Sequence, residues 1–218
     1  DLMAKYINKK SIVALVLSLA AFLYITNNYD VMFIRNIDEG LLAWLVRHTQ
    51  PATVFIFKLI TIMANWQAIV LGSLLLLVFM RDKLMVLLVS AITGIVFIIN
   101  ESFKGMFERP RPNVMQLTHA TGYSMPSGHA VTAMVFYGLI MVFFISKIKD
   151  KRYRTLAYIL LSILIILIAF SRVYLRVHFL SDVIAGLALG LIVTTIIYNI
   201  KVGIFDNITT YLEGEEIE

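Results

Sequence analysis

Long apolar runs alternate with short polar segments along most of this 218-residue chain. Five of the runs reach the roughly 20 residues that a helix needs to cross the hydrocarbon core of a bilayer. They lie at about 11–28, 84–103, 128–146, 155–173 and 183–200. Each is therefore predicted to be a transmembrane helix.

The stretch 51–80 is also apolar, but Lys58, Asn65 and Trp66 interrupt it. Each half alone, at roughly 14 residues, is too short to cross comfortably, and neither Pro nor Gly marks a turn between the halves. We therefore expect one long helix over 51–80, with its first half at the interface, as a sixth span. The segment 31–48 mixes Trp, Leu and Phe with Arg and acids, which is typical of an amphipathic helix in the headgroup layer.

The composition agrees with a membrane protein, because 60% of the residues are hydrophobic, only 15% are charged and the mean hydropathy is +0.85. Soluble domains carry about 25% charged residues, and a chain of this length has too little interior to bury so much apolar surface. We expect an all-α polytopic membrane protein with six transmembrane helices and one interfacial helix. Residues 1–202 would form a single transmembrane domain, and 203–218 an acidic, poorly ordered tail.

Basic residues orient the predicted spans. Eleven lie in the loops on the side of the two termini and eight on the opposite side, and cytoplasmic loops retain Lys and Arg. Five of the eight crowd into 104–111 and 172–176, which indicates a site rather than a topology signal. We therefore expect a multi-pass plasma-membrane protein with cytoplasmic termini and a site at the extracytoplasmic face.

Polar residues are costly in such a chain, and they gather in three clusters that this topology brings to one membrane face. The first cluster, ESFKGMFERPRP, contains Lys104 and Arg111. A compact ammonium and a planar guanidinium together suit an oxyanion. The two prolines favour an extended chain before them, so the preceding helix should end near Phe107 or Glu108. The alternative is that both cations reach toward lipid headgroups.

The second cluster, YSMPSGHA, places Ser127, Gly128 and His129 in the first turn of a helix after Pro126. Unpaired amides at a helix start favour an anion, and glycine lets a ligand approach the backbone. His129 can then exchange a proton with the bound group. The alternative is a plain serine N-cap with an interfacial histidine.

The third cluster, SRVYLRVHFLSD, contains Arg172, His178 and Asp182. If the chain is helical after Val177, His178 and Asp182 are four residues apart and share a face. A carboxylate that holds one imidazole nitrogen leaves the other as a nucleophile or base. The alternative, in which Asp182 only caps its helix and pairs with His178, leaves Arg172 unexplained.

The predicted face thus offers cations, helix-start donors and two histidines, which are the groups that phosphoryl transfer requires. Metal-dependent phosphatases usually supply several carboxylates. Asp182 is the one clear acid here, with Glu101 and Glu108 as ambiguous neighbours. We therefore expect a reaction through a histidine nucleophile, with no metal and no cofactor.

The three motifs resemble, in order and at every fixed position, the tripartite signature of the type 2 phosphatidic acid phosphatase family. They are Lys104-x6-Arg111-Pro112, Pro126-Ser127-Gly128-His129 and Ser171-Arg172-x5-His178-x3-Asp182. The resemblance implies a helical membrane enzyme that dephosphorylates lipid phosphates without metal.

The resemblance also implies residue roles. His178 would attack phosphorus and form a phosphohistidine, Asp182 would orient it, and His129 would protonate the leaving oxygen and activate water. The phosphate would be held by residues of all three motifs, namely Lys104, Arg111, Ser127, Gly128 and Arg172. The size and the outward site resemble bacterial members that act on undecaprenyl diphosphate or phosphatidylglycerophosphate. We favour undecaprenyl diphosphate, because an outward site suits recycling of a carrier whose diphosphate is released outside.

Three residues near the motifs are weaker candidates. Arg109 and Tyr123 are interpreted as secondary substrate contacts, and His119 as a solvated loop histidine or a further contact. Gly186-x3-Gly190 favours close helix packing within the chain over dimerisation.

Other functions remain open alternatives. A small transporter or channel usually has ionisable groups or broken helices near the bilayer midplane, whereas the middles of the clear apolar runs are almost free of charge. A phosphotransferase, or a phosphatase for phosphatidylglycerophosphate or phosphatidic acid, would need the same residues. We expect a lipid phosphate substrate and membrane lipids as partners, and no nucleic acid. The sequence leaves the oligomeric state open.

Overall fold

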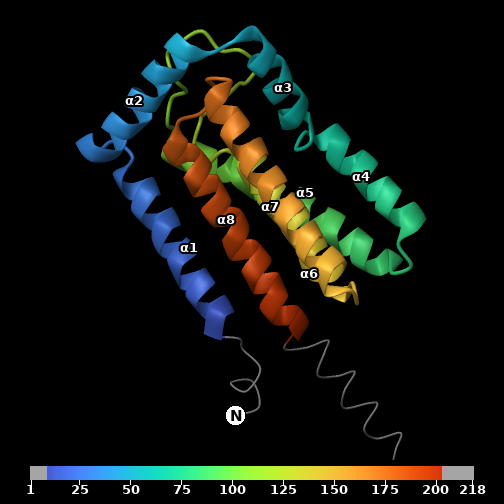
Figure 1. Cartoon of the computed structure of the whole chain (residues 1–218). Coiled ribbons are helices and arrows are strands. Elements are labelled where there is room, and N and C mark those ends of the chain that lie inside the picture. The colour runs from blue at the N-terminus through green and yellow to red at the C-terminus, as the bar shows by residue number, and fades with distance from the viewer. Residues whose placement is uncertain (1–8, 203–218) are drawn as a thin grey trace, which may run out of the picture.

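The computed structural model describes residues 9–202, and its regular elements in that range are helices (Figure 1). They are α1 (Lys9–Asn28), α2 (Met32–His48), α3 (Pro51–Ile62), α4 (Trp66–Phe79), α5 (Lys83–Phe107), α6 (Gly128–Phe143), the 3-10 turn η2 (Ile145–Lys147), α7 (Lys151–Tyr174) and α8 (Leu180–Ile200). The all-α prediction is confirmed. The predicted tail, 203–218, lies outside the described residues.

Within residues 9–202, five helices are long and apolar enough to cross a membrane, namely α1, α5, α6 with the following turn, α7 and α8. They coincide with the five predicted runs to within a few residues. The predicted interfacial helix over 31–48 is present as α2. The sixth span exists only if α3 and α4 are counted together.

The prediction of one continuous helix over 51–80 was wrong, because α3 and α4 meet at an angle of 54°. The chain turns at Met63, Ala64 and Asn65 without the help of proline or glycine. The carbonyl of Met63, freed from helical pairing, accepts a hydrogen bond of 2.8 Å from the hydroxyl of Tyr137 on α6. The bend is therefore stabilised by a partner distant in sequence rather than by a local turn residue.

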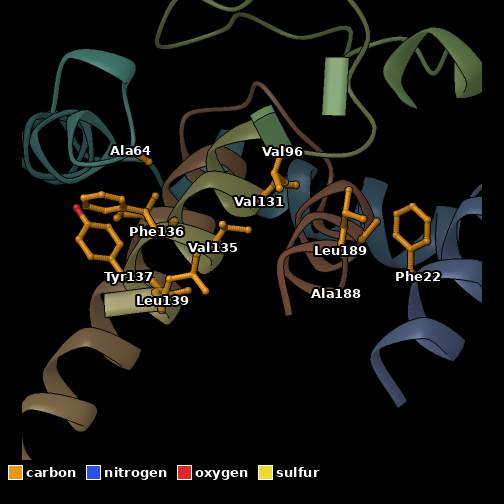
Figure 2. Packing of buried hydrophobic residues seen from close by; sticks show 14 of the residues in the cluster. Phe22, Ala64, Val96, Val131, Val135, Phe136, Tyr137, Leu139, Ala188 and Leu189 are labelled. Carbon is orange, nitrogen blue, oxygen red and sulfur yellow. The ribbon is translucent and has the colours of Figure 1, made fainter. Parts of the chain in front are cut away.

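Helix α6 lies at the centre of the bundle, packed against α5, α7 and α8. It is 61% buried, compared with 28–44% for the other four spans, so its neighbours shield it from lipid. Figure 2 shows Val131 beside Val96 of α5, and Phe136 and Tyr137 directed toward Ala64 at the α3–α4 bend. The core thus fixes the start of α6 relative to all its neighbours.

Glycines bring α8 very close to α6. A Cβ on Gly186 would stand 2.7 Å from the carbonyl oxygen of Ser127, and one on Gly190 would stand 2.6 Å from Cβ of Met134. Both positions therefore require glycine, and the predicted packing within the chain is confirmed. At the same contact, the Ser127 amide donates to the carbonyl of Asp182 at 3.0 Å, which ties the starts of α6 and α8 together.

The two ends of the bundle differ in what they contain. The hydroxyl of Ser11, near the start of α1, donates to the side chain of Asn199 near the end of α8 at 2.7 Å. The segment that links α5 to α6 lies at the opposite end, together with α2 (Figure 1). That second end gathers the three predicted motifs.

Candidate active site

The first motif straddles the end of α5. The helix stops at Phe107, as predicted, because Glu108 adopts a left-handed conformation with φ of 48° and its amide donates to the carbonyl of Lys104. The ammonium group of Lys104 lies 2.6 Å from Oε1 of Glu101 and its side chain is only 11% exposed. Lys104 therefore points into the protein rather than to the headgroup layer.

Arg111 is anchored by backbone carbonyls. Its guanidinium donates to Thr121 at 2.7 Å, to Gly122 at 3.0 Å and to Val177 at 2.8 Å. The same Nη1 lies 3.1 Å from Nε2 of His178, so the first and third motifs meet here. Burial lowers the pKa of Arg111, while the charges of Asp182 and Glu101 raise it.

The second motif begins α6. Ser127 occupies the N-cap position, but its side chain makes no capping hydrogen bond, and its buried hydroxyl has no partner among the described residues. The alternative of a plain serine N-cap therefore fails. A Cβ on Gly128 would stand 3.4 Å from Nδ2 of Asn100 and 3.7 Å from Nζ of Lys104, so the first motif covers the start of α6.

The α3–α4 bend supports two of the predicted residues. Nε2 of His129 lies 2.8 Å from the amide oxygen of Asn65, an acceptor that favours a proton on Nε2. Nη1 of Arg172 donates to the hydroxyl of Thr61 at 2.8 Å. Sequence reasoning missed both supporting residues, although an amide that interrupts an apolar run is itself a signal of function.

The third motif forms a tight turn before α8. Val177 and His178 both donate their amides to the carbonyl of Arg172, at 3.1 and 3.3 Å. Helix α8 begins only at Leu180, so His178 precedes the helix. The condition under which it would share a helical face with Asp182, a helix from Val177 onward, is therefore not met. The two residues still meet, because the turn leaves Nδ1 of His178 at 3.5 Å from Oδ2 of Asp182.

Asp182 has a second set of partners. Its Oδ2 caps α8 by accepting from the amide of Phe179 at 2.8 Å, and its Oδ1 accepts from Arg109 at 2.6 Å. Arg109 also contacts Asp38 of α2 at 2.8 Å and Ser181 at 2.6 Å. A buried chain of charges therefore runs from α2 to the third motif.

These contacts correct the interpretation of Arg109. Its side chain is 6% exposed and lies across the ring of Phe179, with 4.4 Å between the guanidinium carbon and the ring centroid. It is therefore a structural partner of Asp182 and not a substrate contact. Tyr123 is exposed and donates to Glu108 at 3.3 Å. Asp38, 71 residues before Arg109, was not anticipated from the sequence.

His178 is kept neutral by its surroundings. Burial lowers its pKa to about 4; the nearby Asp182 raises it, and the charges of Arg111 and Arg172 lower it further. At neutral pH the ring therefore carries a lone pair, and Nε2 is the nitrogen that faces the donor Arg111. A buried, uncharged imidazole beside two guanidinium groups is equipped to attack an electrophile that carries negative charge.

Several buried side-chain atoms at or near the motifs have no hydrogen-bond partner in the described part of the chain. They belong to Asn100, Ser127, Arg172, Arg176 and His178. Buried polar atoms are normally paired, so these free donors and acceptors indicate a place for a ligand. The cationic donors among them suit an oxyanion.

A pocket of about 460 Å³ opens beside these groups. It is lined by Lys58, Thr61, Ile62, Asn65, Thr118, His119, His129 and Arg172. Two of the predicted site residues, His129 and Arg172, therefore face a cavity, whereas His178 is buried and is not among its lining residues. His119 lines the same pocket, which favours the interpretation of a ligand contact over that of a loop residue alone.

Comparisons with known proteins show which sequences the chain is similar to. The model of the PAP2 superfamily matches residues 83–205. Phosphatidylglycerophosphatase B from Bacillus subtilis (strain 168) is 34% identical over 122 residues, which cover 56% of this chain and 53% of that protein. Lipid phosphate phosphatase delta from Arabidopsis thaliana is 27% identical over 124 residues, 51% of this chain and 30% of that protein. The chain thus spans about half or less of these curated relatives.

Two solved structures share the fold. The crystal structure of a transmembrane PAP2-type phosphatidylglycerolphosphate phosphatase from Bacillus subtilis has a TM-score of 0.78 and 26% identity, covering 84% of this chain and 93% of that one. The structure of LpxE from Aquifex aeolicus has a TM-score of 0.56 and 20% identity, covering 74% and 93%. The second likeness is one of fold alone. The polytopic membrane architecture predicted from the apolar runs is confirmed.

Proposed function

Since this chain belongs to the PAP2 superfamily, we propose that it is a membrane lipid phosphatase that removes a terminal phosphate through a histidine nucleophile. The observation that carries the proposal is the meeting of three distant motifs around His178. Its neutral ring faces Arg111, and Arg172 is close enough to influence its charge. The names of the phosphatase relatives support the same reaction.

In the first step, Nε2 of His178 attacks phosphorus, and the bond from phosphorus to the leaving oxygen breaks as the nitrogen–phosphorus bond forms. His129 gives its proton to the leaving oxygen. Lys104, Arg111 and Arg172 neutralise the charge on the phosphoryl oxygens, as phosphoryl transfer requires. The free Ser127 hydroxyl and the amides at the start of α6 add donors.

Arg111 must serve two partners in turn. Its Nη1 occupies the lone pair of His178 at 3.1 Å, so a bound phosphate has to draw this guanidinium away before Nε2 can attack. The guanidinium then contacts a phosphoryl oxygen instead of the imidazole. Arg111 thereby couples phosphate binding to release of the nucleophile.

In the second step, water attacks the phosphohistidine, the nitrogen–phosphorus bond breaks and His129 takes the proton of the water. Asp182 stabilises the positive charge that the ring of His178 carries in between, through the contact at Nδ1. Inorganic phosphate leaves, and both histidines return to their starting states.

We favour undecaprenyl diphosphate as the substrate, with phosphatidylglycerophosphate as the second candidate. The basic-residue balance supports cytoplasmic termini and an outward site, where a carrier diphosphate would be recycled. The second candidate is favoured by the name of the Bacillus relatives. The expectation of a metal-free reaction comes with the histidine nucleophile in both cases.

The proposal is tested with the purified full chain in detergent, by phosphate release from undecaprenyl diphosphate, phosphatidylglycerophosphate and phosphatidic acid with chelator present. We expect release that His178→Ala abolishes and vanadate inhibits. The matched variant Arg47→Ala, at an exposed position near the end of α2, should retain it. Strict dependence on magnesium, or normal turnover by His178→Ala, would overturn the proposal. If substrate instead crosses the membrane of sealed vesicles, and the His178→Ala variant transports it at the same rate, the protein is a transporter.

Acid quenching during turnover separates two outcomes of the phosphohistidine step. A labelled phosphoryl group bound to the protein, lost in His178→Ala, supports the covalent intermediate. The same label recovered on an added acceptor alcohol rather than as inorganic phosphate would identify a phosphotransferase.

A further inference from the structure

The pocket beside His129 extends onto one face of α3, and that face carries a charge. Lys58, Thr61 and Ile62 are three and four residues apart, so they share a face of the helix, and all three line the pocket. Lys58 is the only charged residue in α3, whose sequence is PATVFIFKLITI. The side chain of Lys58 is exposed, so a ligand in the pocket can reach its ammonium.

The lining of the pocket is cationic. Among the residues that the structure describes, the lining includes Lys58, Arg172, His119 and His129, and it includes no Asp or Glu. The ammonium of Lys58 has no ion-pair partner among residues 9–202. A concave surface with this charge concentrates anions. The cavity, at about 460 Å³, falls in the range of roughly 300–1,000 Å³ that ligand pockets occupy.

The position of the pocket relates it to the leaving group. His129, the proposed proton donor to the leaving oxygen, lines the pocket, and the nucleophile His178 does not. Arg172 is shared between the two sides, because it lines the pocket and its charge acts on His178. The part of the substrate that stays attached to the leaving oxygen therefore lies in the pocket that Lys58 lines.

We infer that Lys58, assisted by His119, forms the subsite for the second phosphate of the lipid diphosphate proposed above. When His178 attacks the terminal phosphorus of such a lipid, the bridging oxygen departs on the lipid monophosphate and takes the proton of His129. The remaining phosphate lies against Lys58, which stabilises its negative charge. A lipid monophosphate leaves an uncharged alcohol at the same place and gains nothing from the lysine.

This inference rests on the proposed function and deepens it, because it assigns the leaving-group side of that same site. Thr61 and Asn65 are already engaged with Arg172 and His129. Lys58, the one charged residue of α3, therefore remains as the group on this side that can pair with a negatively charged ligand. The inference thus predicts selectivity between substrates that differ only in the number of phosphates.

The test compares farnesyl diphosphate with farnesyl monophosphate, which share one tail, by initial rates of phosphate release in one detergent. We expect Lys58→Ala to lower kcat/KM for the diphosphate by about 10- to 100-fold, as loss of a charge-assisted contact does. The loss for the diphosphate should exceed that for the monophosphate at least tenfold. Lys58→Arg should restore most of the preference.

The control Arg47→Ala removes an exposed cation outside the pocket and should leave the ratio of the two kcat/KM values unchanged. Equal losses for both substrates in Lys58→Ala, or no loss for either, would overturn the subsite. Failure of the proposed function has a different signature, because His178→Ala would then retain release from both substrates whatever Lys58→Ala does.

Discussion

Around His178 the neighbouring groups are buried and mostly paired, whereas on the side of α3 the site opens into a pocket. We call His178, Asp182, Arg109 and Asp38 the nucleophile side; the exposed fractions of their side chains are 6% or less. The pocket side consists of Lys58, Thr61, Asn65 and His129, which line one cavity. One side is closed around an ion-pair chain, and the other is open to a ligand.

In the mechanism proposed above, the difference follows from which part of the substrate each side contacts during the reaction. The nucleophile side always meets a phosphoryl group, so a fixed geometry serves every substrate and a buried chain of charges can hold it. The pocket side meets the leaving group, which varies between lipids. Changes on the nucleophile side should therefore alter the rate for all substrates, and changes on the pocket side should alter selectivity.

Removal of the nucleophile gives the largest expected effect. His178→Ala should lower kcat by at least roughly a thousandfold, and Asp182→Asn by about a hundredfold or more, since removal of a nucleophile or of its orienting carboxylate has such costs elsewhere. Both losses should be the same for diphosphate and monophosphate substrates. Steady-state kinetics with both substrates test this. A change in the ratio of the two kcat values in either variant would contradict the distinction between the nucleophile side and the pocket side.

Breaking the buried ion-pair chain should come next. Asp38→Asn leaves Arg109 with Asp182 as its one carboxylate and should destabilise the protein by about 3 kcal/mol, with a parallel loss of kcat and little change in KM. Thermal unfolding and kinetics of the same preparation measure both effects.

The chain offers a matched control one residue away. Glu39 pairs with Arg35 at 2.8 Å, but both side chains are more than half exposed, and exposed pairs contribute little. Glu39→Gln should therefore leave the unfolding temperature and kcat unchanged. Equal effects of Asp38→Asn and Glu39→Gln would show that the buried chain has no special role.

Loss of the acceptor for His129 should be milder. Asn65→Ala removes one hydrogen bond of 2.8 Å, and a single such bond corresponds to roughly a 2- to 10-fold change in rate. The loss should be greatest for substrates with poor leaving groups, because they depend most on the proton from His129. A comparison of an alkyl phosphate with p-nitrophenyl phosphate tests this, and uniform losses would argue against the leaving-group assignment.

The smallest expected effect is that of mild acid on the nucleophile. With its pKa lowered to about 4, His178 stays neutral as the pH falls through 6.5, so below pH 6.5 its protonation should cost less than about 10% of kcat/KM until pH 5. An acid limb of kcat/KM near pH 6.5 that moves with substitutions around His178 would contradict this.

The lowered pKa of His178 also makes the free energy of unfolding depend on pH. The unfolded imidazole, with a pKa of about 6.5, binds a proton that the folded one does not bind until the pH nears 4. The free energy of unfolding therefore falls as the pH decreases from 6.5 toward 4. Unfolding curves across this window should show a slope that His178→Ala reduces.

The sequence predicted the five clear spans because each is a run of apolar residues of the right length, and it predicted the end of α5 from the prolines that follow. It could not predict the bend between α3 and α4. That bend depends on Tyr137, which lies 74 residues from its acceptor Met63. A local pattern without proline or glycine contains no sign of such a distant partner.

The supporting residues of the site could not be predicted either, because their partners are also distant in the sequence. The signature residues were identified from motif spacing, and the structure brings them together. Arg109 was interpreted as a secondary substrate contact because it lies beside the motifs along the chain, whereas its real partners are Asp182 and Asp38, 73 and 71 residues away. Which of two adjacent acids, Asp38 or Glu39, is buried is decided by how α2 packs, and the sequence pattern gives no such register.

The part of the chain that matches the family depends on residues that precede it. The match to the family begins at residue 83, so an excised fragment that starts there would retain all eight predicted site residues. It would lack Asp38, Thr61 and Asn65, and with them the groups that orient Arg109, Arg172 and His129. Such a truncated protein would keep the complete signature and still be a poor catalyst, because the N-terminal part supplies the scaffold for residues that the family pattern records.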